Sequence, residues 1–190
     1  MEWNDFYNQK GINDKLTLRL LHMKSSMLFL LIVLTLTGKS NAQKMDSTKR
    51  YIRVPAGFLM VLRQGDDIFT QLEKLAETEK ILSANISGMG FVNAKFGFFN
   101  QKTKEYDPKG FSDVEMASMN GSVAWQKEKV SLHIHGVVTD KNFHAFGGHM
   151  LAATVSTGSV EILVTMHDKR LERIMEEPLG ANVLYLGNEN

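Results

Sequence analysis

The 190-residue sequence contains no cysteine and only three prolines, and its positive and negative charges almost cancel. Without cysteine the chain can form no disulfide, no thiolate metal site and no cysteine nucleophile. Its 22 Lys and Arg residues stand against 21 Asp and Glu residues, a formal net charge of +1. This balance lacks the strong positive charge that underlies sequence-independent binding to nucleic acids. Any metal site must therefore use imidazole or carboxylate ligands.

The first 42 residues have the pattern of a secretory signal. An apolar run at 27–36 follows a basic residue and precedes a small polar stretch, with Ser40 and Ala42 at positions −3 and −1 of a predicted cleavage site. Ten helical residues span about 15 Å, half of the hydrocarbon core of a bilayer, so the run is too short to cross it. We predict a leader over residues 1–42, with Met23 as an alternative start. A buried N-terminal helix or strand is the other interpretation of this run.

Cleavage would leave an exported chain, periplasmic or secreted, with no attachment to a membrane. Residues 43–190 hold 17 Lys and Arg residues and 18 Asp and Glu residues, so the net charge of this part is negative. That sign further disfavours nucleic acid as a partner. We divide it into a flexible segment at 43–50, one domain at 51–187 and a tail at 188–190. The 43% hydrophobic residues suffice for one domain with a core.

The residue pattern of the domain predicts one main helix and about eight strands. Gly65-Asp66-Asp67 is typical of a helix start, where Asp66 can accept hydrogen bonds from free N–H groups, and the apolar spacing that follows predicts a helix to about Lys80. A second short helix is expected at 168–175. Alternating apolar residues bounded by glycine predict strand segments at 51–54, 58–62, 81–87, 92–100, 114–119, 122–125, 130–139, 150–155, 160–166 and 182–186. These elements predict an α+β domain built on a mostly antiparallel, twisted sheet with one crossover helix.

Histidine is concentrated late in the chain. The six histidines are His22, His133, His135, His144, His149 and His167. His133 and His135 alternate along one predicted strand, so they share a face with Cα atoms about 7 Å apart. After a polar turn at 139–142 an antiparallel return brings His149, or less favourably His144, beside this pair. Three neutral imidazoles with an open fourth position resemble a catalytic zinc site more than a closed structural one.

The same spacing also fits histidines that hydrogen-bond to neighbouring groups or face water. His22 falls in the predicted leader, and His167, next to Asp168, is expected at the surface. Glu115 and Glu161 alternate with apolar residues and are expected as solvated charges on a sheet face. Spacing alone therefore leaves metal binding open.

Several motifs together resemble one family, the plants-and-prokaryotes conserved (PPC) domain. The segment LHIHG at 132–136, a variable turn and the segment FGGHML at 146–151 are similar to its signature, an HxH strand followed by a GGH return. Similar segments at 51–65, 86–90, 115–121 and 160–164 extend the resemblance over roughly residues 50–187. The combination is specific, although each segment alone is a weak signal.

The resemblance implies an α+β fold of the prokaryotic single-domain type that assembles as a homotrimer and whose grouped histidines hold a metal, commonly zinc. Carried onto this sequence, the metal ligands would be His133, His135 and His149, whereas His144 lies in the variable turn. Plant members carry an Arg-Gly-Arg-Pro element for the DNA minor groove, and this sequence has none. The fold is also similar to that of acetolactate decarboxylase, where zinc on three histidines polarises a carbonyl.

We therefore expect an exported, trimeric module that binds a metal or an unidentified small ligand, with zinc as the cofactor. A zinc-dependent lyase or decarboxylase is the alternative, and DNA binding by family analogy is a second alternative. The sequence identifies no catalytic residue.

Overall fold

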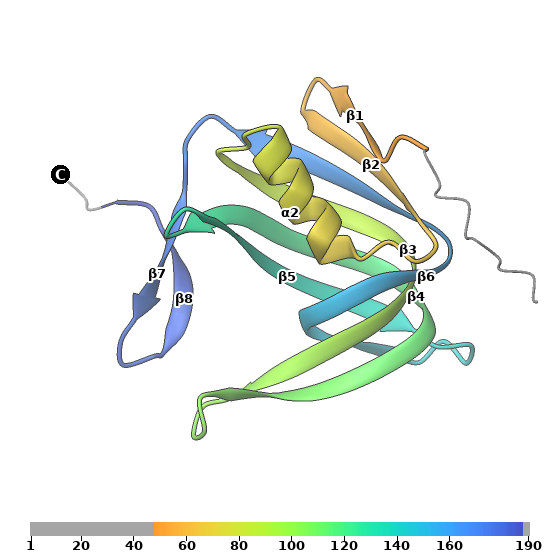
Figure 1. Cartoon of the computed structure of the whole chain (residues 1–190). Coiled ribbons are helices and arrows are strands. Elements are labelled where there is room, and N and C mark those ends of the chain that lie inside the picture. Colours follow the sequence, from red (N-terminus) through yellow and green to blue (C-terminus); the bar gives the residue numbers. More distant parts are fainter. Residues whose placement is uncertain (1–47, 188–190) are drawn as a thin grey trace, which may run out of the picture. The chain divides into compact units, whose positions relative to one another are not determined.

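The structure is a computed structural model, and it describes residues 48–187. The elements are β1 (Tyr51–Val54), β2 (Gly57–Arg63), α2 (Ile68–Thr78), β3 (Ser83–Asn100), β4 (Glu105–Gln126), β5 (Lys129–Thr139), β6 (Ala145–His167), β7 (Glu172–Glu176) and β8 (Ala181–Tyr185). Within these residues, the set of elements confirms the predicted mostly antiparallel sheet with one helix (Figure 1). The predicted leader, most of the flexible segment and the tail lie outside the described residues. In the described part, no helix has the length and apolar character that a membrane crossing requires.

Long, bent strands replace several shorter predicted ones. β3 continues through the break that the sequence predicted at 88–91, with register shifts between Gly88 and Gly90 and between Val92 and Ala94. β4 likewise shifts register between Met116 and Ser118. Bulges absorb extra residues, so a strand bends where the sequence pattern predicts an end.

The prediction of a short helix at 168–175 is wrong. Residues Glu172–Glu176 form β7, which pairs antiparallel with β8 through Arg173 and Leu184 and through Ile174 and Val183. Backbone pairing with the partner strand outweighs the local preference of the segment, as is common for strands.

The N-cap of the main helix lies one residue later in the sequence than predicted. Asp67, not Asp66, is the N-cap, and its carboxylate accepts a hydrogen bond from the backbone N–H of Thr70 at 2.8 Å. Asp66 instead binds the guanidinium of Arg50 and accepts from the backbone N–H of Arg63. The helix ends at Thr78, close to the predicted Lys80.

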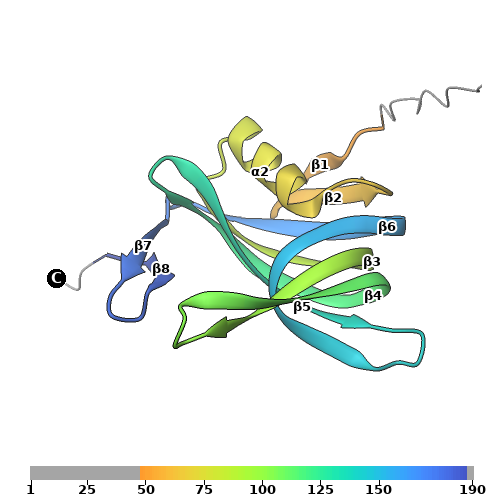
Figure 2. The ribbon, with the colours of Figure 1, turned by 60° about the horizontal axis from the view of Figure 1, so that its bottom comes forward.

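Figures 1 and 2 show α2 over one face of the sheet, and the buried hydrophobic residues include those of α2 and of the strands below it. The helix buries Ile68, Leu72, Leu75 and Ala76, the spacing expected for a helix with one apolar face. Strands β3, β4, β5 and β6 close a circuit, because β3 and β5 each pair with both β4 and β6. The circuit holds the central strands in fixed register.

The opposite face of the sheet carries a continuous row of residues. Successive register partners share a face of a sheet. Across the strands from β1 to β6 these partners are Ile52, Leu59, Leu163, Ser87, Asn120, His135 and His149. The histidines therefore lie on the sheet face that turns away from the core.

Candidate metal centre

Two neighbouring strands bring three histidines together. His133 and His135 project from one face of β5, and His149 of β6 is the register partner of His135. β6 also pairs with β3 at this point, where Gly97 is opposite His149. The antiparallel return expected from the sequence is present, and it brings His149 to the pair.

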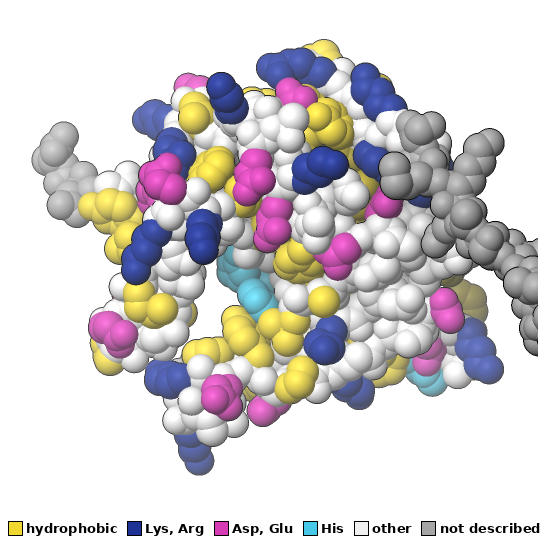
Figure 3. All heavy atoms as spheres, in the orientation of Figure 1, with side chains coloured by type: hydrophobic (Ala, Val, Ile, Leu, Met, Phe, Trp, Pro, Cys, Tyr) yellow, Lys and Arg dark blue, Asp and Glu magenta, His cyan; other side chains and the backbone are white. Residues whose placement is uncertain are grey.

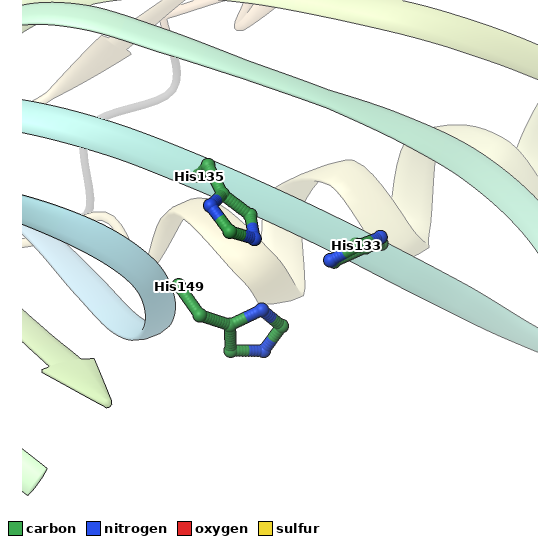
Figure 4. Close-up of side chains that lie close together, drawn as sticks. All are labelled: His133, His135 and His149. Carbon is green, nitrogen blue, oxygen red and sulfur yellow. The ribbon is translucent and has the colours of Figure 1, made fainter. Parts of the chain in front are cut away.

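The three imidazole rings converge on one point. Their centroids lie 5.1, 5.1 and 5.2 Å apart, and one ring nitrogen from each lies within 4.8 Å of the others. Figure 4 shows the rings of His133 and His135 from one strand and that of His149 from the next around a common space. A tetrahedral zinc ion at its usual bond length holds its nitrogen ligands about 3.3 Å apart.

Glycines let β5 and β6 approach each other beside the histidines. A Cβ atom at Gly147 would lie 2.5 Å from the backbone oxygen of Gly136, which is closer than real side chains come. Gly148, the residue before His149, has φ 153°, a conformation that favours glycine. The two glycines of the sequence motif are thus required for the local path of the strand.

Two of the rings, those of His133 and His149, favour the neutral form. Desolvation, together with the neighbouring His133 and His135, lowers the pKa of His149 to about 4. Desolvation also lowers the pKa of His133, and the nearby guanidinium of Arg173 and the ring of His135 add to this effect. Neutral imidazole is the form that ligates metals. Three imidazole nitrogen donors without a carboxylate or thiolate fit zinc and other ions that prefer imidazole.

The histidines border a cavity of about 830 Å³. Its wall is largely aromatic, and it includes Phe96, Phe98, Phe99, Tyr106, Phe111 and Phe146. The ring of Tyr106 stacks on His149 with centroids 4.6 Å apart and planes 13° apart, and Phe99 packs against Tyr106. In Figure 3 histidine side chains lie at the edge of a hollow beside hydrophobic side chains. A small ligand can therefore reach the cluster through an apolar space.

Two residues near the cluster were not predicted from the sequence. Arg173 of β7 is only 5% exposed, and its Nη2 donates a hydrogen bond of 2.6 Å to Oγ of Ser122. Ser122 is the register partner of His133. Tyr106 belongs to a segment of β4 in which no strand was predicted. Neither residue forms part of the histidine motif. Both could be found only once the strands that carry them were known.

The remaining candidate residues lie elsewhere. The side chain of His144 is 68% exposed in the loop after β5, where its Nδ1 lies 3.2 Å from a carboxylate oxygen of Asp140. His167 ends β6 and is not in the cluster. Glu115 and Glu161 are exposed on strands. His22 lies outside the described residues.

Comparison with known proteins identifies related chains. The Plants and Prokaryotes Conserved (PCC) domain, which is the family called PPC above, matches residues 51–168. A solved structure from Ralstonia eutropha JMP134, named as a candidate DNA-binding protein, is 49% identical with a TM-score of 0.71 and covers 73% of this chain and 96% of its own. No curated protein matches the chain.

Two further solved structures share 29% of their residues with this chain. One, from Bacteroides thetaiotaomicron, is also named as a candidate DNA-binding protein; its TM-score is 0.67, and the match covers 71% of this chain and 95% of that one. The other is the metal-containing protein of Archaeoglobus fulgidus, with a TM-score of 0.62 and coverage of 73% and 99%. The family match spans more than half of the sequence, and the chain belongs to the plants and prokaryotes conserved domain family.

Proposed function

We propose that this protein is a metal-binding module in which His133, His135 and His149 hold a zinc ion. The observation that carries the proposal is the convergence of three ring nitrogens within 4.8 Å of one another. The name of the Archaeoglobus fulgidus relative, a metal-containing protein, supports it. The neutral state that desolvation imposes on His149 also supports it, because a protonated ring cannot bind a metal.

The proposed module also takes a small ligand at the metal. Three protein ligands leave a tetrahedral ion one open position, and a bound zinc ion supplies Lewis acidity there. In this chain the aromatic wall of the cavity lies beside the histidines, and Tyr106 holds the ring of His149 by stacking. The chain thus provides a fixed set of donors beside an apolar space.

Binding is favoured over catalysis by the groups around the site. Asp107 is the carboxylate that lines the cavity among the described residues, and it is exposed beside Asn100, whose Nδ2 lies 3.5 Å from it. A carboxylate that is open to solvent lacks the buried surroundings that a general acid at neutral pH usually needs. The zinc-dependent lyase therefore remains the alternative, and DNA binding rests only on the names of two relatives.

The proposal includes a homotrimer that is exported from the cell. An apolar patch on the outer face of the sheet, made of Ile52, Leu59, Met89 and Leu163, supports self-association, since exposed apolar patches mark contact surfaces. Three of these residues line a groove of about 330 Å³. Export rests on the sequence of residues 1–42 alone.

Metal analysis of the purified protein tests the proposed site. We expect about one zinc ion per chain in the wild type and a loss of at least tenfold in affinity when a ligand is removed, because two imidazoles hold zinc far more weakly than three. The variants are His133→Ala, His135→Ala and His149→Ala, and zinc is measured by mass spectrometry after dialysis against a weak chelator. His144→Ala is the matched control, since this exposed histidine lies outside the cluster. Undiminished zinc in His135→Ala would contradict the proposal.

A further inference from the structure

The buried guanidinium of Arg173 has no charged partner. Its Nη2 donates to the neutral hydroxyl of Ser122, and its Nε has no hydrogen-bond partner. Among residues 48–187 no carboxylate lies within 4.0 Å of it; Glu172, the preceding residue, binds Arg170 instead. Burial lowers the pKa of Arg173, which shows that its charge is desolvated. A buried charge that lacks a counter-charge is costly and is usually compensated.

This positive charge lies next to the histidine cluster. Ser122, which anchors the guanidinium, is opposite His133 in the pairing of β4 with β5, so both side chains share one face of the sheet. The guanidinium is close enough to lower the pKa of His133. A divalent ion on three neutral imidazoles would add two more positive charges that no protein ligand offsets.

The cavity wall does not neutralise this excess. Its charged side chains are Lys109 and Asp107, which have opposite signs. The ammonium of Lys109 lies over the rings of Phe111 and Phe146, at 5.4 and 5.5 Å from their centroids. The charges of the lining residues therefore cancel. The net charge at the site is then positive, because it comes from Arg173 and the proposed ion.

We propose that the cavity binds small organic carboxylates with a flat apolar body. This inference rests on the proposed metal site: the carboxylate takes the open position on the ion, and its body lies against the aromatic wall. Arg173 is not a lining residue of the cavity, so its charge, held near His133 through Ser122, acts on the carboxylate without direct contact. Carboxylates are common partners of both groups, and aromatic walls favour flat ligands. A neutral ligand of the same shape leaves the positive charge uncompensated and binds more weakly.

Calorimetric titration with three small probes tests the inference. Benzoate has the charge and the flat body, benzamide has the body without the charge, and acetate has the charge without the body. We expect zinc-loaded protein to bind benzoate at least about tenfold more tightly than either of the others, the usual difference made by one charged hydrogen-bonded contact or one buried ring. Equal affinity for benzoate and benzamide would overturn the inference.

Variants of Arg173 identify the source of the selectivity. Arg173→Gln removes a charge near the cluster that lies outside the cavity lining, so it should weaken benzoate binding and leave benzamide unchanged. Arg173→Lys keeps the charge and should retain most of the preference. Arg63→Gln, which removes the same charge at an exposed position outside the cavity lining, is the matched control. If Arg173→Gln fails to fold, the comparison of benzoate with benzamide on the wild type still tests whether the cavity prefers carboxylates.

Zinc content, measured on the same samples, separates the two proposals. Protein that retains zinc at the three histidines but does not prefer benzoate overturns the carboxylate inference and leaves the metal site standing. Protein that does not retain zinc contradicts the proposed function itself.

Discussion

At the scale of single residues, desolvation determines the chemistry of the candidate site. His149 lies between two strands with the ring of Tyr106 stacked on one side and two imidazoles on the other. These neighbours exclude water and disfavour a second positive charge, and both effects keep the ring neutral. Desolvation also makes the charge of Arg173 costly, because no carboxylate of the described residues lies beside it to balance that charge.

The lowered pKa of His149 predicts how the metal-free protein responds to acid. The pKa is about 4 in the folded chain against an ordinary value of 6.5, so the unfolded state binds more protons between these values. Stability should therefore fall as the pH decreases from about 6.5 to about 4 and should not depend on this group above that range. Urea unfolding of the chelated protein at pH 7 and pH 5 measures the effect.

The control for this prediction replaces the ring. His149→Gln cannot take up the proton, so its stability should fall less between pH 7 and pH 5 than that of the wild type. His144→Gln, at an exposed loop position, should behave as the wild type does. Identical pH dependence in wild type and His149→Gln would show that this ring is not desolvated.

The histidine cluster was predictable because its geometry depends on one strand and its return. Alternation places His133 and His135 on one face, and an antiparallel return brings back His149. Arg173 and Tyr106 were not predictable in this way. Arg173 reaches the site from β7, which follows the last long strand and whose segment was expected to be helical, and Tyr106 reaches it from the far end of a hairpin.

At the scale of elements, the site depends on the close approach of β5 and β6. Gly136 and Gly148 are register partners, and the backbone oxygen of Gly136 occupies the space that a side chain at the neighbouring Gly147 would need. The pair lies next to the register pair of His135 and His149. The separation of these strands therefore sets the separation of the three histidines.

Gly147→Ala tests this dependence. The added methyl group must push the strands apart, and we expect a loss of about 1–3 kcal/mol in the free energy of unfolding, as for other overpacked positions, together with weaker zinc binding. Gly110→Ala is the matched control, because a Cβ atom there would meet nothing within 4 Å. Urea unfolding and zinc titration of both variants give the comparison; equal behaviour of the two variants would contradict the proposed role of the close approach.

The elements themselves were predictable to different degrees. The helix and strand β5 follow from periodicity, and they form close to the predicted residues. The merging of short segments into β3, β4 and β6 was not predictable, because glycine marks both a turn and a bulge. For the same reason, the sequence did not predict a strand in the part of β4 that carries Tyr106.

At the scale of the whole domain, the two sheet faces have different roles. The face under α2 holds the core, and the other face carries a row from Ile52 to His149. An apolar patch at one end of this row and three histidines at the other would place the proposed self-association and the proposed metal site on the same face. A trimer that covers the patch would leave the cavity at the far end of the row for a ligand.

The most direct test of the central claim is a crystal structure of the zinc-loaded protein with diffraction data collected on both sides of the zinc absorption edge. We predict one anomalous peak per chain, about 2.0–2.1 Å from one ring nitrogen of each of His133, His135 and His149. A peak that lies away from these three rings, or the absence of any peak at them, would contradict the account.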